Sequence, residues 1–479
     1  MKKTFSLIEQ LQQLLGKDRV ISNPDELIVF ECDALTLHKN IPEGVVLPES
    51  TEEVSAITKL CSEHKTPFLA RASGTGLSGG ATPAKGGVII QLSRMNQILE
   101  IDYEDEIAVV QPGVINLHLT EAVSSRNYHF APDPSSEKAC TIGGNVAENA
   151  GGPHTLKYGV TTNHVLGMKT VSPTGEIVEI GGRCEDSPGY DLTGLFTGSE
   201  GTLGIITEVT VKLTRNPESI KTLLVVFNSV EDASISVSNI IAEGIIPAAM
   251  ELIDQLAISA VEQHLNVGYP TDATAVLLIE IDGVATSLDK EMKRIQQICL
   301  SNRAMIAQIA RTDKEREDLW RGRKETVGAL GKITPAYYTN DGVVPRSKLP
   351  EILADTIRIG NKYGLRIGNI CHAGDGNIHP LILYNPDDKN EVENAIKVSE
   401  EIIKKCIELG GSITGEHGVG TEKSEYLGMM FSEEDQEQMK KIRDVFNPDY
   451  LLNPDKIFPT QSKRNKINLK KTKKLKGWL

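Results

Sequence analysis

Three of the ten histidines fall in two short segments toward the end of the chain, and each segment also carries glycines and an acidic residue. Two imidazoles and one carboxylate are a common ligand set for a divalent first-row metal ion such as zinc or manganese. His372 and His379 offer the imidazoles, Glu416 is the candidate carboxylate and Asp375 is its competitor. The spacing is also compatible with histidines that are buried in a core or solvated at the surface, so it leaves metal binding open.

Two further side chains are candidates for a catalytic role. His417 follows Glu416 directly, and a neutral imidazole with a pKa near ~6.5 suits proton abstraction at neutral pH. Arg323 is a candidate anchor for a substrate carboxylate, because a guanidinium group can donate two parallel hydrogen bonds to it. The alternative is that Arg321, Arg323 and Lys324 form a solvated helix face.

A glycine-rich loop follows a predicted strand at residues 67–70 and spells G-x-G-x-x-G through Gly74, Gly76 and Gly79. In nicotinamide-binding domains these glycines open a helix, whose N-terminus receives the pyrophosphate. No helix is expected here, because Pro83 and further glycines come next and a second strand follows at once. We therefore favour a loop between two strands whose backbone N–H groups bind the pyrophosphate of a dinucleotide in another fold. A nicotinamide site and a plain turn are the alternatives.

Before residue 216 the chain alternates short strands with glycine-rich blocks. Residues 45–92 are expected to form a strand, a helix, a strand, the glycine loop and another strand, with Ser50 and Glu53 as a capping box. Further strands are expected at 107–111 and 205–213, and two more glycine-rich blocks lie between them, at 141–152 and 198–204. Three such blocks in one region indicate an extended ligand that is contacted by backbone along its length.

After residue 216 long helices alternate with strands, which indicates an α+β domain. The expected strands are 223–227, 275–281, 366–371 and 378–384, and the expected helices are 231–243, 285–300, 347–363 and 389–409. The tight loop between strands 366–371 and 378–384 contains the two-histidine segment, so this hairpin would turn His372 and His379 toward one point.

The composition is that of a globular enzyme. The chain of 479 residues allows roughly two to four domains. Its net charge of −14 argues against nucleic-acid binding. No stretch approaches the roughly 18 apolar residues of a membrane span, and no signal peptide is evident. The seven cysteines form no C-x-x-C pair, which excludes the usual iron–sulfur and structural-zinc spacings and favours a cytoplasmic location.

The last segment, 460–479, is rich in lysine and contains no acidic residue from Gln461 onward. We expect a solvated, disordered tail. Contact with an anionic membrane surface or with a partner protein is the alternative.

These segments together resemble the flavin-dependent 2-hydroxy-acid dehydrogenases with the vanillyl-alcohol-oxidase, or PCMH-type, FAD fold, in particular the glycolate oxidase FAD subunit and D-lactate dehydrogenase group. The resemblance covers residues 41–458, and the motifs occur in family order. It implies an α+β protein in which a PCMH-type FAD-binding domain precedes an α+β (ferredoxin-like) FAD-linked oxidase C-terminal domain. The expected organisation is a helical segment at 1–40, the FAD-binding domain at 41–216, the substrate- and metal-binding domain at 217–459 and the tail at 460–479.

The resemblance also implies roles for individual residues. His372, His379 and Glu416 match the family's metal ligands, His417 its proton acceptor and Arg323 its substrate-carboxylate arginine. The residues implied to bind FAD are Gly74, Thr75, Gly76, Leu77, Ser78 and Gly79 at the pyrophosphate, Asp133, Gly143, Gly144, Asn145, Asn149, Gly152 and Gly159 along the rest, Glu200, Gly204 and Ile206 toward the adenine, and Asn453 returning to the flavin. Some relatives attach FAD through a histidine near the pyrophosphate loop. No histidine lies between His64 and His118, so non-covalent FAD is expected.

The implied reaction is oxidation of glycolate or D-lactate to the 2-oxo acid, with hydride transfer to flavin N5. Electrons would then pass to quinone or to an acceptor subunit, either an iron–sulfur protein or an electron-transferring flavoprotein. Leu381 stands two residues after the second histidine, where relatives that oxidise dicarboxylic hydroxy acids tend to carry a polar residue; this favours a monocarboxylate over D-2-hydroxyglutarate. The motifs are also compatible with a non-redox enzyme of the same fold such as an ether-lipid synthase, with a metal hydrolase and with a flavin-binding module.

Overall fold

The first helix lies within the N-terminal segment 1–40, which is expected to be helical. In the computed structural model, which describes residues 5–185 and 188–460, α1 spans Leu7–Leu15 and buries Leu11 and Leu15. Ser6 caps the helix by accepting a hydrogen bond from the Glu9 amide. The chain then forms strand β1, which pairs with β2, so the N-terminal segment completes the first sheet of the molecule.

The first sheet carries the glycine loop. Within the described residues it has four strands in the order β1-β2-β4-β3, and β4 runs parallel to both of its neighbours. The elements are β1 Val20–Ile21, α2 Pro24–Leu27, β2 Gly44–Val46, α3 Thr51–Glu63, β3 Phe68–Arg71 and β4 Val88–Gln91. Residues 72–87 connect β3 to β4 without a helix, as the sequence predicts.

The capping box expected at the start of α3 is only half formed. The Ser50 hydroxyl accepts from the Glu53 amide as expected. The Glu53 carboxylate does not return to Ser50, because it accepts from the Glu49 amide at 2.7 Å and from both guanidinium nitrogens of Arg19 at 2.8 Å.

The remaining glycine blocks lie in connections between strands of the second sheet of the first domain. Its order is β5-β6-β10-β8-β9. The elements are β5 Ile98–Asp102, β6 Ile107–Val110, α4 Asn116–Val123, β7 Tyr128–His129, α5 Ile142–Glu148, α6 Thr155–Tyr158, β8 Val165–Val171, β9 Ile177–Gly181, α7 Leu192–Phe196, β10 Ile205–Lys212 and β11 Thr214–Arg215. The sequence did not predict α5, which Thr141 caps by accepting from the Gly144 amide.

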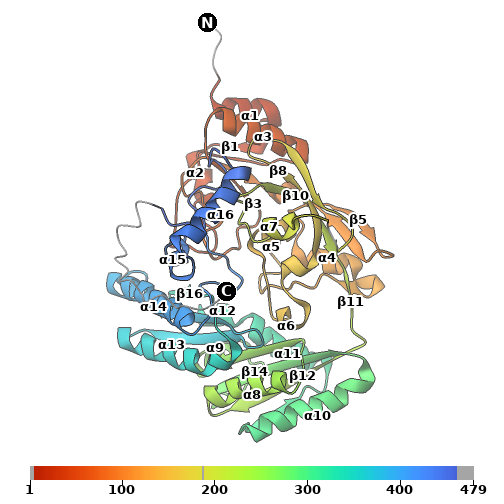
Figure 1. Cartoon of the computed structure of the whole chain (residues 1–479). Helices are drawn as coiled ribbons and strands as arrows, with labels where there is room; N and C mark the ends of the chain where they lie inside the picture. Colours follow the sequence, from red (N-terminus) through yellow and green to blue (C-terminus); the bar gives the residue numbers. More distant parts are fainter. Residues whose placement is uncertain (1–4, 186–187, 461–479) are drawn as a thin grey trace.

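The second domain is an antiparallel sheet with helices on both faces (Figure 1). Its main strand order is β15-β12-β14-β13-β18-β19-β16. The first four strands have the 4-1-3-2 order of a ferredoxin-like unit when numbered along the chain. The elements are β12 Ser219–Phe227, α8 Val230–Ala242, β13 Ala249–Asp254, α9 Gln255–Leu265, β14 Ala275–Gly283, α10 Ala285–Ser301, β15 Ile306–Ile309, α11 Asp313–Lys324, α12 Thr326–Leu330, β16 Ala336–Thr339, β17 Gly342–Val343, α13 Leu349–Tyr363, β18 Arg366–His372, β19 Asn377–Tyr384, α14 Lys389–Glu408, α15 Leu427–Met430 and α16 Glu433–Phe446.

The two faces of this sheet have different partners. Apolar side chains of α8, α10, α13 and α14 pack with one face in a single large core cluster. The other face packs with α9, α11 and α12, and it also bears His379, which lies directly opposite Ile370 in the β18–β19 pair. The histidines therefore project from the face that the first domain covers.

The C-terminal segment returns to the first domain (Figure 1). The Phe68 amide donates to Leu451 at 2.9 Å, and the Asn453 amide donates to Phe68 at 2.7 Å. Leu452 is fully buried in the core of the first domain. The basic tail lies outside the described residues beyond Thr460. Across the described ranges, no helix combines the length and apolar character needed to cross a bilayer.

Candidate active site

A cavity of about 290 Å³ runs between the two domains, from the glycine loop to the histidines. Most of the residues expected at the cofactor or substrate line it: Gly74, Thr75, Gly76, Leu77, Gly143, Gly144, Asn145, Glu200, Gly204, Ile206, Asn453, Arg323, His372, His379, Glu416 and His417. One continuous space thus joins the three glycine blocks of the first domain to the chemical groups of the second.

Three carbonyl groups of the glycine loop accept hydrogen bonds from other parts of the chain. The Ser78 carbonyl accepts from the amides of Thr421 and Glu422. The Gly79 carbonyl accepts from the Lys456 ammonium at 2.6 Å, and Asn453 donates to the Gly80 carbonyl at 3.1 Å. All of these donors come from the C-terminal part of the chain.

The backbone N–H groups of the loop remain free to bind a ligand. Those of residues 74–80 donate to no acceptor in the described part of the chain. Buried N–H groups are rarely left unpaired, and a row of them is a site for an anion such as a pyrophosphate. A Cβ built on Gly76 would meet no atom nearer than 3.8 Å, so the loop leaves space there for close approach of a ligand. These features fit a dinucleotide cofactor.

Six residues expected to bind the cofactor do not line the cavity: Ser78, Gly79, Asp133, Asn149, Gly152 and Gly159. Asp133 accepts from the His154 ring at 2.7 Å. Gly152 has a φ of +144°, and a Cβ there would lie 2.5 Å from the Asp133 carbonyl oxygen. Asn149 ends α5 in the left-handed conformation and accepts from the Thr162 amide. In this structure these groups shape the loops behind the cavity.

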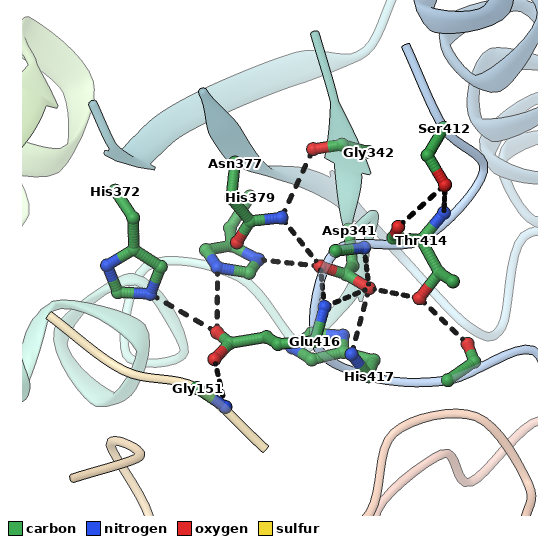
Figure 2. A network of polar contacts seen from close by, with 12 residues as sticks. Gly151, Asp341, Gly342, His372, Asn377, His379, Ser412, Thr414, Glu416 and His417 are labelled. Atoms are coloured by element: carbon green, nitrogen blue, oxygen red, sulfur yellow. Dashed lines mark hydrogen bonds and ion pairs between the residues drawn. The ribbon is translucent and has the colours of Figure 1, made fainter. Parts of the chain in front are cut away.

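The two histidines and Glu416 meet at one point, as Figure 2 shows. The Nε2 atoms of His372 and His379 each lie 3.2 Å from Glu416 Oε1. The three potential ligand atoms lie within 4.8 Å of one another. Asp375 is outside this group, because its carboxylate accepts from the Asn377 amide within the hairpin turn. Of the two acids considered from the sequence, Glu416 is therefore the one that meets both imidazoles.

In this cluster the carboxylates and the imidazoles stabilise each other's charged forms. Burial raises the pKa of Glu416, but the attraction of His372 and the hydrogen bonds from both histidines hold that pKa well below its usual value. Burial lowers the pKa of His372, but Glu251 and Glu416 raise it well above the usual value. The other Glu416 oxygen accepts from the Gly151 amide at 3.2 Å, across the domain boundary. Two imidazoles and an ionised carboxylate fit a divalent cation with at least one position open to another ligand.

His417 lies beside this cluster on the cavity wall. Its ring stacks on His379 with the centroids 5.1 Å apart. Burial lowers the pKa of His417 to about 4. The imidazole is therefore neutral at pH 7 and can accept a proton from a group bound in the cavity.

Asp341, which the sequence analysis missed, holds the segment that carries Glu416 and His417. Its fully buried carboxylate accepts from the amides of Gly415 and His417 at 3.0 Å each. It also accepts from the side chains of Asn377, Thr414 and Lys423. These donors engage both oxygens, so Asp341 serves as a support, even though its carboxylate lies near His379 and His417. Asp341 lies in the two-residue link between β16 and β17, and the Asn-Asp-Gly sequence there carries no signal of this role.

Arg323 is buried in the cavity wall and is not part of a solvated face. Its residue exposure is 3%. One terminal nitrogen, Nη2, lies 2.5 Å from Glu251 Oε2. Neither its Nε nor its Nη2 group makes a hydrogen bond among the described residues, so both are unsatisfied donors on a residue of the cavity wall. A bound carboxylate would satisfy them.

The chain is similar to known FAD-linked oxidases. Residues 216–457 match the model of the C-terminal domain of FAD linked oxidases, and residues 42–181 match an FAD binding domain. The chain is 44% identical to glycolate oxidase subunit GlcD of Escherichia coli K12, over 95% of this chain and 91% of that one. It is 35% identical to a D-lactate dehydrogenase of Anaerostipes hadrus, over 95% and 98%. The solved structure of 4-ethylphenol oxidase from Gulosibacter chungangensis has the same fold, with a TM-score of 0.78, 19% identity and coverage of 95% and 97%.

Proposed function

The chain belongs to the FAD-linked oxidase family and is an FAD-dependent oxidoreductase of the glycolate oxidase subunit type, and from this we propose that it oxidises glycolate or D-lactate to the 2-oxo acid. One observation carries the proposal. The cavity that begins at the unpaired N–H groups of the glycine loop ends at a buried arginine, a neutral histidine and a histidine–glutamate cluster. A dinucleotide and a small anionic substrate fit the two ends of this space.

Different residues would bind the cofactor and the metal ion. Backbone groups of loop 74–79 and of Gly143, Gly144 and Gly204 would hold FAD, and His372, His379 and Glu416 would hold a divalent ion, zinc or manganese. When bound, FAD supplies an acceptor for a hydride at N5, and the metal ion supplies polarisation of the substrate hydroxyl. The glycine-loop residues that line the cavity include no histidine, which supports non-covalent attachment of FAD.

The side chains of the second domain orient the substrate and move its proton. Arg323 donates to the substrate carboxylate through its unsatisfied Nε–H group and fixes one end of the molecule. His417 accepts the hydroxyl proton while the α-hydrogen leaves. Holding the substrate at both ends exposes a single hydrogen for transfer and excludes competing poses.

The cation content of the cavity favours a monocarboxylate over 2-hydroxyglutarate. Its arginines are Arg71 and Arg323, and Arg71 already donates to the carbonyls of Cys32 and Ala81. Leu381 is fully buried in the core under the sheet, so it provides no polar partner for a second carboxylate. One arginine therefore remains for one carboxylate.

Electrons from the reduced cofactor would leave through a partner protein. The E. coli relative is named as a subunit, and the cysteines of this chain lack iron–sulfur spacing. We therefore propose that an acceptor subunit, either an iron–sulfur protein or an electron-transferring flavoprotein, receives the electrons. Direct transfer to quinone is the alternative.

Anaerobic mixing tests the proposed function. The holoenzyme is mixed separately with glycolate, D-lactate, L-lactate and D-2-hydroxyglutarate, and flavin absorbance near 450 nm is followed. Glycolate or D-lactate should bleach the flavin fastest, and acid precipitation should leave the flavin in the supernatant. Bleaching by none of the four acids would contradict the assignment, and faster bleaching by 2-hydroxyglutarate would contradict the substrate class.

A further inference from the structure

A buried carboxylate on β13 joins the two ends of the substrate site without lining the cavity. Glu251 has no exposed surface. One of its oxygens, Oε1, lies 2.8 Å from His372 Nδ1, and the other, Oε2, lies 2.5 Å from Arg323 Nη2. The residue is absent from the cavity wall, whereas both of its partners are part of it.

The fold gives Glu251 this position through strand register. In the antiparallel β13–β18 pair, Glu251 lies directly opposite His372. Arg323 comes from the last turn of α11, on the same face of the sheet. Three distant parts of the sequence therefore meet in one charged group. A buried charge is costly unless it is paired, and here the pairing uses one oxygen for each partner.

The contact with His372 determines which ring nitrogen can bind a metal. A carboxylate oxygen only accepts, so the His372 ring donates its Nδ1–H to Glu251 and its Nε2–H to Glu416. A metal ion bound through Nε2 would replace the second proton, whereas Glu251 keeps the first one on Nδ1, which is the arrangement in which carboxylates orient metal-binding histidines. Arg323 Nη2 lies beside Glu251 Oε2 as an ion pair, and neither Nη2 nor the Nε–H group makes a hydrogen bond among the described residues.

We propose that Glu251 is a positioning residue that sets the distance and orientation between the metal ligand His372 and the substrate-binding Arg323, so that one carboxylate couples metal affinity to carboxylate recognition. This inference rests on the proposed function, because both partners act there. Glu251 touches neither the substrate nor the metal. Its loss therefore weakens the binding of the metal and of the substrate carboxylate together. The glycine loop lies in the other domain and keeps its cofactor.

Glu251→Gln in the FAD-loaded full chain tests the coupling. The amide keeps the shape but removes the charge and turns an NH₂ group toward one of the two partners. Zinc alone is titrated calorimetrically into chelator-treated wild type and variant, and KM and kcat for glycolate are measured after zinc is restored. Zinc affinity should fall about 10- to 100-fold, in line with the loss of an outer-shell partner. KM should rise by a factor on the order of ten at saturating zinc, with FAD content unchanged.

Asp254→Asn is the matched control. Asp254 is a buried carboxylate on the same strand, and it also bridges to β18, where it accepts from the Asn369 amide at 2.7 Å. It contacts neither His372 nor Arg323. Its replacement should therefore lower thermal stability while zinc affinity and KM stay within about threefold of wild type.

Each outcome decides for or against the coupling role. The inference is overturned if Glu251→Gln binds zinc and glycolate like wild type, or if Asp254→Asn loses both to the same degree. If Glu251→Gln does not retain FAD, Glu251→Asp decides: it keeps the charge with a shorter reach and should weaken zinc and glycolate together by a smaller factor. A wild type that neither binds zinc nor bleaches with any 2-hydroxy acid contradicts the proposed function itself, which a failure of the variants alone does not.

Discussion

At the scale of single residues, the proposed proton transfer depends on keeping His417 neutral. Its imidazole stacks on His379, and burial depresses its pKa to about 4. The sequence made this residue a candidate from its place after Glu416, and it also proposed the other members of the cluster as metal ligands. It left the choice between Asp375 and Glu416 open, because only the turn geometry shows that Asp375 is used within its own hairpin.

Replacing His417 by alanine should remove flavin reduction without removing the flavin. The reduction rate with glycolate should fall by about 100- to 10,000-fold, the range that a positioned general base contributes. Rapid mixing under anaerobic conditions measures the rate, and the absorbance spectrum measures bound FAD. His118→Ala, at an exposed position on α4, is the control and should keep the wild-type rate. Reduction of the His417→Ala flavin at a near-normal rate would rule out this role.

At the scale of elements, the helices and strands that could be predicted are those whose apolar pattern or capping residues lie within their own segment. Apolar runs and cap residues indicated α3 and, in the second domain, the strands β12, β14, β18 and β19. Helix α5 was missed because Gly143 and Gly144 lower helix propensity, whereas in the structure the Thr141 cap and the packing of Gly143 against Pro112 allow it to form. Side chains that work through long-range register, such as Glu251 opposite His372, have no signature in their own segment.

The Glu416–His417 segment should depend on Asp341 for its shape. Asp341 and Lys423 are both fully buried and lie 3.1 Å apart, so removing one charge leaves the other unpaired. Asp341→Asn should therefore cost about 3–5 kcal/mol of stability. Thermal unfolding of the holoenzyme should show a clear loss of Tm. Flavin reduction should slow because the backbone N–H groups of Gly415, Glu416 and His417 lose their carboxylate. A Tm and a reduction rate equal to those of wild type would show that the segment holds its shape without Asp341.

At the scale of the whole molecule, the active site exists only because two domains close on each other. Gly151 donates to Glu416, and Glu200 accepts from the amides of Val419 and Gly420 at 2.7 Å each. The C-terminal segment adds Lys456, which donates to the glycine loop. The sequence predicted the fold of each half and the cofactor, but these contacts join residues far apart along the chain and could not be foreseen from either half.

One interdomain contact should make stability depend on pH. The His154 ring bridges Asp133 of the first domain and Glu280 of the second, at 2.7 Å and 3.1 Å. Burial lowers the pKa of His154, but Asp133 and Glu280 together raise it well above its usual value. Arg316 lies 3.9 Å from Glu280, and Lys324 interacts electrostatically with both carboxylates. A raised folded-state pKa contributes stability fully below about pH 6.5, and this contribution disappears as pH rises through the folded-state value.

The Tm of wild type should therefore exceed that of His154→Gln most clearly near pH 6, and the difference should shrink as pH rises toward 9. Differential scanning fluorimetry of the two holoenzymes across this range measures it. His118→Gln serves as the control and should follow wild type at every pH. A difference between wild type and His154→Gln that is constant with pH would show that the bridge does not depend on the charge of the imidazole.

The central claim is that a hydroxy acid is oxidised at a metal held by His372, His379 and Glu416 beside the flavin. Its most direct test is anaerobic flavin bleaching by glycolate or D-lactate in holoenzyme that has been stripped of metal by a chelator and then titrated with zinc or manganese. Bleaching should be slow after stripping, and its rate should recover in proportion to added metal, with FAD bound throughout. An undiminished rate after complete metal removal, verified by elemental analysis, would contradict it.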